Sequence, residues 1–238
     1  MEQNNKIEES VSASGILPPR IILASGSPRR LELMHQAGFE VEVIPSHADE
    51  NVSGGTPEEI VRCLSKRKAE DVVRYLLQNK ADNAAGVILQ AKTGEQPSGK
   101  IQQISILVLG ADTIVARDAD ILGKPSSPEE AAATLRSLSG RSHDVYTGVT
   151  LAEIKDGVIG REETFSVRTK VYFCSLTEEE IQKYVATGDP MDKAGSYGIQ
   201  GSFARYVEKI EGDYYNVVGL PVSAVYHRLK EWGIFPQI

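Results

Sequence analysis

The chain has 238 residues, of which 41% are hydrophobic and 25% are charged, a composition typical of globular proteins and unlike that of disordered or fibrous chains. Its formal net charge of -7 argues against broad binding to nucleic acid polymers, which needs a basic face, but allows a local basic pocket for a small anion. The two cysteines, Cys63 and Cys174, match neither a zinc site nor a disulfide scaffold, and we expect both to be buried free thiols.

The first 19 residues are mostly polar, and we expect them to form a disordered extension ahead of a single domain over residues 20–238. They show neither the basic start nor the apolar core of a signal peptide, and no later run is long enough to span a bilayer. We therefore expect a cytoplasmic protein that does not bind membranes.

An apolar strand is expected at residues 20–23, followed by small residues and by a helix that opens with Pro28, Arg29 and Arg30 and ends near Gly38. Backbone N–H groups at a helix start, together with two guanidinium groups, suit an anion such as phosphate. The alternative is a plain strand-to-helix turn with two solvated arginines.

A strand is expected at residues 39–45, and a loop with the acids Asp49 and Glu50 follows it. The run Thr-Pro-Glu-Glu then begins a helix over about residues 57–77. The apolar side of this helix carries one charged residue, Lys68. Its ammonium group either reaches the surface along the flexible stem or points into a polar cavity.

Residues 78–103 are rich in Asn, Gln, Gly and Lys, and we interpret them as a polar surface insertion. A buried strand is expected from residue 104 to about residue 115, and it contains Asp112 followed by Thr113. A carboxylate in such an apolar run is costly unless a cation, a metal or hydrogen bonds meet its charge, so Asp112 is the best catalytic candidate. The alternative is a structural Asp satisfied by backbone amides at a bulge.

The second half of the chain alternates helices and strands. Lys124 lies in a Gly-Lys-Pro loop, just before a helix that a Ser-Pro-Glu-Glu motif opens. Strands at residues 145–154 and 162–173 are joined through an Asp-Gly turn, so they are expected to pair antiparallel. A further helix ends near Gly188, and a short strand and a closing helix complete the chain.

A glycine-rich loop over residues 194–201 separates the last two helical regions and contains Gln200. Its three glycines allow close approach of the backbone to a ligand, and the Gln200 amide offers both a donor and an acceptor. This combination suits recognition of the edge of a base. The alternative is a tight turn with a surface glutamine.

Together these residues suit phosphoanhydride chemistry. Four cations are placed to bind a polyphosphate and to stabilise a leaving pyrophosphate: Arg29, Arg30, Lys68 and Lys124. The carboxylates of Asp112 and Glu50 would hold a divalent metal that bridges phosphate oxygens. Asp112 acts either as general base toward water or as a metal ligand, and we favour the base. The chain has no Walker-type or kinase phosphate loop and no Gly-x-Ser-x-Gly element.

Several short blocks recur in a fixed order and cover nearly everything from Ile21 to the final helix. They are the runs at residues 23–30, 49–50, 68–69, 110–113, 123–125, 138–140, 194–201 and 218–221. In these blocks and their order, the chain resembles the Maf family of nucleoside triphosphate pyrophosphatases. Together they are far more specific than any one of them alone.

The resemblance implies hydrolysis of a nucleoside triphosphate to the monophosphate and pyrophosphate, with Mg2+ or Mn2+. It also implies a homodimer, and a cleft between two lobes of a mixed α/β fold related to inosine triphosphate pyrophosphatases. By residue-by-residue transfer, Asp112 is the proton acceptor, and Ser25, Arg30, Lys68 and Lys124 match the phosphate-site positions.

Three positions indicate the branch of the family. The branch acting on 7-methyl-GTP has Trp, Gln and Glu where this chain has Arg29, Thr113 and Gln200, and the chain is similar instead to the dTTP/UTP branch. Gln200 complements a uracil or thymine edge, which presents both a donor and acceptors. Two alternatives stay open: a nucleotide-binding regulator of cell division with little turnover, and a purine-directed house-cleaning pyrophosphatase.

Overall fold

The computed structural model describes residues 19–52, 54–79, 105–118 and 120–236. The predicted N-terminal extension, apart from its last residue, and the predicted insertion after residue 79 therefore lie outside the described residues. The described elements follow in chain order: β1 (Arg20–Leu23), α1 (Pro28–Gln36), β2 (Val41–Val43), α2 (Pro57–Gln78), β3 (Ser105–Arg117), β4 (Asp120–Leu122), α4 (Pro128–Leu138), β5 (Ser142–Lys155), β6 (Val158–Phe173), α5 (Glu178–Val185), the 3-10 turns η2 (Asp189–Asp192), η3 (Ala194–Ser196) and η4 (Ser202–Tyr206), β7 (Val207–Glu211), α6 (Tyr214–Val218) and α7 (Val222–Glu231).

Within the described residues, the strands form one seven-stranded sheet in the order β2-β1-β3-β5-β6-β7, with β4 paired to β3. β1 is parallel to β2 and β3, and the remaining pairs are antiparallel. The prediction of an α/β protein with a mixed, partly antiparallel sheet is therefore confirmed. The short β4, α6 and 3-10 turns were not predicted from the sequence.

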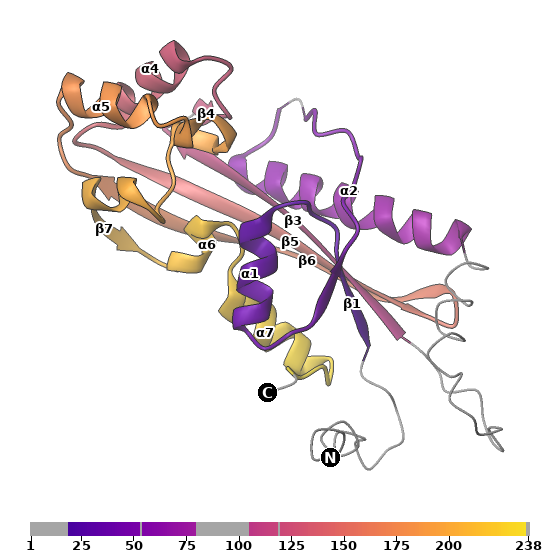
Figure 1. Cartoon of the computed structure of the whole chain (residues 1–238). Helices are drawn as coiled ribbons and strands as arrows, with labels where there is room; N and C mark the ends of the chain where they lie inside the picture. The colour runs from indigo at the N-terminus through magenta and orange to yellow at the C-terminus, as the bar shows by residue number, and fades with distance from the viewer. Residues whose placement is uncertain (1–18, 53, 80–104, 119, 237–238) are drawn as a thin grey trace, which may run out of the picture.

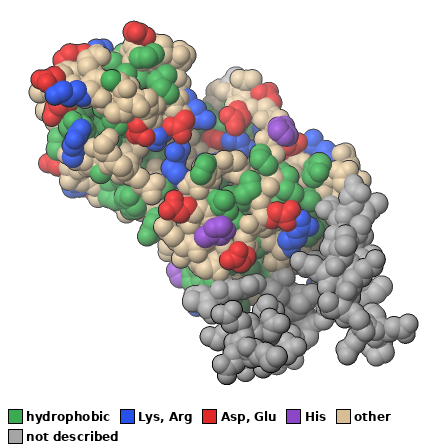
Figure 2. All heavy atoms as spheres, in the orientation of Figure 1, with side chains coloured by type: hydrophobic (Ala, Val, Ile, Leu, Met, Phe, Trp, Pro, Cys, Tyr) green, Lys and Arg blue, Asp and Glu red, His purple; other side chains and the backbone are tan. Residues whose placement is uncertain are grey.

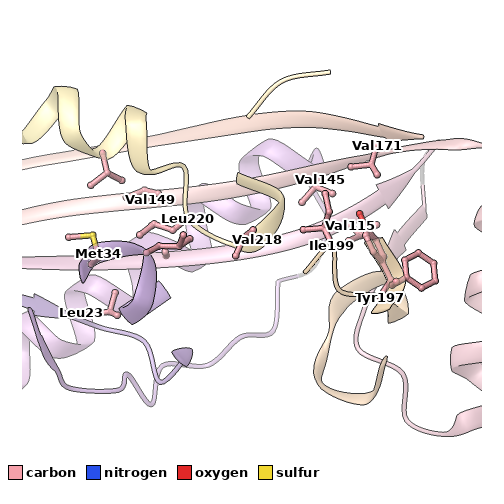
Figure 3. Packing of buried hydrophobic residues seen from close by; sticks show 14 of the residues in the cluster. Leu23, Met34, Val115, Val145, Val149, Val171, Tyr197, Ile199, Val218 and Leu220 are labelled. Carbon is pink, nitrogen blue, oxygen red and sulfur yellow. The ribbon is translucent and has the colours of Figure 1, made fainter. Parts of the chain in front are cut away.

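Helices cover both faces of the sheet (Figure 1). Side chains alternate between the faces along each strand, so Ile22 and Val108 pack with the apolar side of α2, whereas Leu23 and Leu109 belong to the larger core on the other face. That larger core also takes in buried residues of α1, α4, α5 and α7. Figure 3 shows Met34 of α1 close to Leu23 in this core.

The two cysteines are more exposed than the sequence analysis predicted. Cys63 is half-buried and Cys174 is exposed, so the prediction that both thiols are buried was wrong, although both are free. Cys174 directly follows the end of β6, outside the packed faces of the sheet.

In the described part of the chain, no helix has the length and hydropathy that a bilayer crossing requires.

Two glycines bring α2 unusually close to the centre of the sheet. A Cβ atom at Gly110 would lie 2.3 Å from the carbonyl oxygen of Ser65, and one at Gly148 would lie 2.1 Å from that of Val61. Gly148 is the strand partner of Asp112 across the β3–β5 pair. The missing side chains therefore let the α2 backbone approach the sheet directly beside the predicted catalytic residue.

Gly148→Ala is expected to lower the free energy of unfolding by about 1–3 kcal/mol, because the added methyl group displaces the backbone of α2 from the sheet. Urea denaturation followed by circular dichroism measures this loss. Gly160→Ala is the matched control, since a Cβ atom at this β6 position meets no atom closer than 3.8 Å. An unchanged midpoint for Gly148→Ala would show that α2 does not depend on this close contact.

Candidate active site

The central strand β3 has one uncovered stretch of edge. On that side, β1 pairs with β3 only up to the Leu23–Leu109 pair, and β4 begins to pair at Val115. The residues in between include Asp112 and Thr113, which point to opposite faces of the sheet because side chains alternate along a strand. The predicted carboxylate and its neighbouring hydroxyl therefore sit where the sheet leaves room for a ligand.

A cavity of about 390 Å³ opens at this edge. Eight of the nine predicted site residues line it: Arg29, Arg30, Glu50, Lys68, Asp112, Thr113, Lys124 and Gln200. The ninth, Ser25, is not on the wall but accepts a hydrogen bond from Arg30 at 3.0 Å. Figure 2 shows basic and acidic side chains together along the hollow between the end of the molecule with α4 and α5 and the part with α1 and α2. Residues far apart in the chain thus meet in one charged cavity.

Lys68 joins the two predicted acids. Its ammonium group lies 2.6 Å from Asp112 Oδ1 and 2.7 Å from a Glu50 carboxylate oxygen. The side chains of Lys68 and Asp112 are only 13% and 12% exposed, whereas that of Glu50 is 65% exposed. The hydrogen bond from Lys68 lowers the pKa of Glu50, against the opposing effect of partial burial. Lys68 therefore points into the cavity, and the alternative that it snorkels to the surface is wrong.

Arg30 is the buried cation of the opposite wall. Its guanidinium donates hydrogen bonds to the carbonyl oxygen of Gly219 at 2.8 Å, to Ser25 Oγ at 3.0 Å and to Thr113 Oγ1 at 3.0 Å. Burial lowers the pKa of Arg30, and the charge of Asp112 opposes that shift. All three acceptors are neutral, so the positive charge of Arg30 stays available to an anion in the cavity.

A chain of hydrogen bonds connects Thr113 to buried residues of the core. Its hydroxyl lies 2.9 Å from that of Thr147, which in turn donates to the carbonyl oxygen of Asn216 at 3.1 Å. The Asn216 amide donates to Val145 and to a further buried threonine. This chain of buried hydrogen bonds fixes the segment that presents Gly219 to Arg30.

The remaining predicted residues differ from Lys68 and Arg30 in their partners and in their exposure. Lys124 makes no ion pair or hydrogen bond with another described residue, so its ammonium group is available in the cavity. Arg29 forms a 3.3 Å ion pair with Asp192, and Gln200 is exposed at the rim. Asp49, the neighbour of Glu50, instead caps the backbone N–H of Asn51 and does not line the cavity.

Two further segments of the cavity wall were not assigned to the site from the sequence. Asp192 and Lys193 line the cavity just before the glycine-rich loop, and Val217, Val218 and Gly219 line it from the end of α6. A charged pair directly ahead of a glycine-rich loop was a usable signal for the first segment. The second contributes a carbonyl oxygen and apolar contacts, for which residue type gives no indication.

Among the described residues, no group of three or more His, Cys, Asp or Glu side chains is placed to hold a metal ion. Glu50 and Asp112 nevertheless converge on one point, since both contact the same ammonium group. Mg2+ is usually held by one or two carboxylates together with phosphate oxygens of the substrate. These two carboxylates therefore fit a divalent cation that binds with a phosphate ligand.

Comparison with known proteins gives consistent matches. Residues 20–232 match the family described as Maf-like protein. The chain is 46% identical over 215 residues to a protein of Agathobacter rectalis named dTTP/UTP pyrophosphatase, a match that covers 90% of this chain and 98% of the relative. It is 43% identical over 214 residues to a protein of Carboxydothermus hydrogenoformans with the same name, with 90% and 99% coverage.

Among the solved structures that match is that of a nucleoside-triphosphatase named dITP/XTP pyrophosphatase from Mycobacterium abscessus. The match has 13% sequence identity and covers 90% of this chain and 96% of the other. The TM-score of the match is 0.34.

Proposed function

The chain belongs to the Maf family, and from this premise we propose that it hydrolyses nucleoside triphosphates, above all dTTP and UTP, to the monophosphate and pyrophosphate. Relatives at 43–46% identity, matched over 90% of this chain, bear the name dTTP/UTP pyrophosphatase. The observation that carries the proposal is the largely buried carboxylate of Asp112, which Lys68 contacts at the uncovered edge of β3 and which faces a cavity with Arg30 and Lys124.

In the proposed reaction, Asp112 is the general base. Lys68 contacts only its Oδ1, and no hydrogen bond from another described residue engages Oδ2, so Oδ2 is available to a water molecule. Asp112 takes a proton as the water oxygen bonds to the α-phosphorus. The bond from that phosphorus to the oxygen bridging the α and β phosphates breaks, and pyrophosphate leaves.

The cations of the cavity bind the triphosphate. Arg30, Lys68 and Lys124 approach from α1, α2 and the loop before α4, so their charges surround a bound polyphosphate and offset the charge that collects on pyrophosphate as it leaves. Ser25 assists by orienting the Arg30 guanidinium. A divalent cation held by Glu50 and Asp112 would supply further positive charge at the phosphates.

Three residues are proposed to select the base. Gln200 lies at the rim of the cavity, where its amide matches the donor and acceptors of a uracil or thymine edge. Arg29 and Thr113 approach the cavity from α1 and from β3. A guanine edge would instead favour a carboxylate at the position of Gln200.

The test is the release of pyrophosphate from a panel of canonical and modified nucleoside triphosphates with Mg2+ or Mn2+. We expect kcat/KM for UTP and dTTP to exceed that for ATP, GTP and CTP by about tenfold or more, because the base contacts discriminate by hydrogen bonding. A preference for purine nucleotides would contradict the proposed selectivity. Tight binding of UTP without release of pyrophosphate would contradict the proposed activity and would favour the alternative, a nucleotide-binding regulator.

A further inference from the structure

We propose that Tyr184, Asp189 and Lys193 are positioning residues. They hold the glycine-rich loop at residues 194–201, called the Gln200 loop below, in the conformation that selects a pyrimidine base. The inference rests on the proposed function, because it assigns the support of the same selectivity site. Tyr184 lies in α5 and Asp189 begins η2. None of the three was predicted from the sequence as a site residue.

The hydroxyl of Tyr184 connects the loop to Asp189. It donates to Asp189 Oδ2 at 2.5 Å and accepts a hydrogen bond from the backbone N–H of Gly198 at 3.1 Å. Burial and the hydrogen bond to Asp189 raise the pKa of Tyr184 well above its ordinary value, so the hydroxyl keeps its proton. Its ring is 1% exposed and packs against Phe203 with the ring centroids 4.7 Å apart. The anchor of Gly198 is thus part of the rigid core, two residues before Gln200.

Lys193 covers the loop from the other side. Its ammonium group donates to the backbone carbonyl oxygen of Asp189 at 2.6 Å, to Asp189 Oδ1 at 2.9 Å and to Asp192 Oδ1 at 2.7 Å. An ammonium group has three N–H donors, so none remains for a phosphate group. Lys193 therefore lines the cavity without acting as a phosphate ligand, in contrast to Lys124, which makes no ion pair with another described residue.

The aliphatic stem of Lys193 lies directly over Gly198. A Cβ atom at Gly198 would be 2.7 Å from Cε and 3.0 Å from Cδ of Lys193. The loop is thereby held by a hydrogen bond on its N–H group and by packing on its α-carbon. Both contacts depend on Asp189, which accepts from Tyr184 and from Lys193.

The same network reaches the second predicted selectivity residue. Asp192 accepts from Lys193 through Oδ1 and pairs with Arg29 through Oδ2 at 3.3 Å. Arg29 comes from α1, 163 positions earlier in the chain. Arg29 and the Gln200 loop are therefore connected through two charged contacts, Arg29–Asp192 and Asp192–Lys193, and through the packing of the Lys193 stem on Gly198, so their relative position is set before a nucleotide binds.

The test compares base selectivity in Tyr184→Phe, which removes only the hydroxyl. We define selectivity as kcat/KM for UTP divided by that for CTP. Loss of the acceptor for the partly buried N–H group of Gly198 loosens the loop, so the ratio should fall about fivefold to tenfold through a higher KM for UTP, with kcat for UTP nearly unchanged. Tyr206→Phe is the matched control, because the Tyr206 hydroxyl makes no hydrogen bond with another described residue although its ring belongs to the same cluster.

A double-mutant cycle shows whether Tyr184 acts through Gln200. Gln200→Ala should lower the UTP to CTP ratio, and adding Tyr184→Phe should lower it no further, because the loop then has no base-reading side chain to position. Independent, multiplicative losses would contradict the inference. So would an unchanged ratio in Tyr184→Phe.

A second variant covers the case in which Tyr184→Phe folds poorly. Lys193→Met keeps a stem over Gly198 but removes the ammonium group, and it should lower the ratio in the same direction. Lys183→Met is its control, since Lys183 forms an exposed pair with Glu179 on α5. An unchanged ratio in Lys193→Met would remove Lys193 from the network.

Binding measurements separate this inference from the proposed function. The dissociation constants of UMP and CMP, measured by calorimetry for the same proteins, require no turnover. If the parent protein hydrolyses no triphosphate but still prefers UMP and loses that preference in Tyr184→Phe, the proposed function fails and the inference stands. If the parent protein does not distinguish UMP from CMP, or the variant keeps the preference, the inference fails whatever the activity.

Discussion

Asp112→Asn is expected to lower kcat/KM for UTP by about a thousandfold while leaving the fold and nucleotide binding intact. The amide has nearly the shape of the carboxylate but cannot accept a proton from water. Lys68 keeps a charged partner in the variant, because Glu50 also contacts its ammonium group at 2.7 Å. No buried cation is left unpaired, so we expect little change in the free energy of unfolding.

The measurement is single-turnover release of pyrophosphate, together with the dissociation constant of UMP. Asp144→Asn is a matched control, since Asp144 is also a strand aspartate paired with cations, Arg168 and Lys170, but it lies outside the cavity lining. A chemical step at nearly the parent rate in Asp112→Asn would exclude Asp112 as general base. A large loss of UMP affinity instead would indicate a role in binding.

Local signals were enough to predict most of the fold. The capping box at Thr56 is formed in the structure and begins α2 at the expected residue. Lys68 and Asp112 were each anomalous charges in an apolar pattern, and the structure shows that the two groups lie 2.6 Å apart. Such a mismatch between polarity and burial is visible in sequence because it violates a local rule.

The contacts that hold the site residues in place could not be predicted from local sequence signals. The carbonyl oxygen that orients Arg30 belongs to Gly219, 189 positions later, and a backbone acceptor has no residue-type signature. Tyr184 reads as an ordinary core aromatic residue, and only the fold shows that its hydroxyl meets Gly198. Likewise, no sequence pattern distinguishes Gly148, and a side chain is excluded there only because the backbone of α2 crosses β5 at this position. These contacts are set by tertiary packing, which local patterns do not encode.

Lys68→Met is expected to lower kcat/KM for UTP by about a hundredfold to a thousandfold, because it removes a fixed positive charge at the phosphates and the contact that orients Asp112. It should also change the pH dependence of the activity that remains. In the parent protein, Lys68 is the largest cause of the lowered pKa of Glu50, followed among the attractive charges by Lys124 and Arg30. Without Lys68, the pKa of Glu50 rises, so Glu50 becomes protonated at a higher pH as the solution is acidified.

If ionised Glu50 is needed, the acidic limb of the pH profile must therefore move to higher pH in Lys68→Met. The measurement is kcat/KM from about pH 4 to pH 8, the range around the ordinary pKa of a glutamate, at a temperature well below the melting point. Lys66→Met is the control on the same helix, because Lys66 is exposed and pairs with Glu162 and Glu70 outside the cavity lining. Parent activity in Lys68→Met would remove Lys68 from the reaction. Lost activity with an unmoved acidic limb would mean that Lys68 serves the phosphates and Asp112 alone, and that the Glu50 carboxylate need not be ionised.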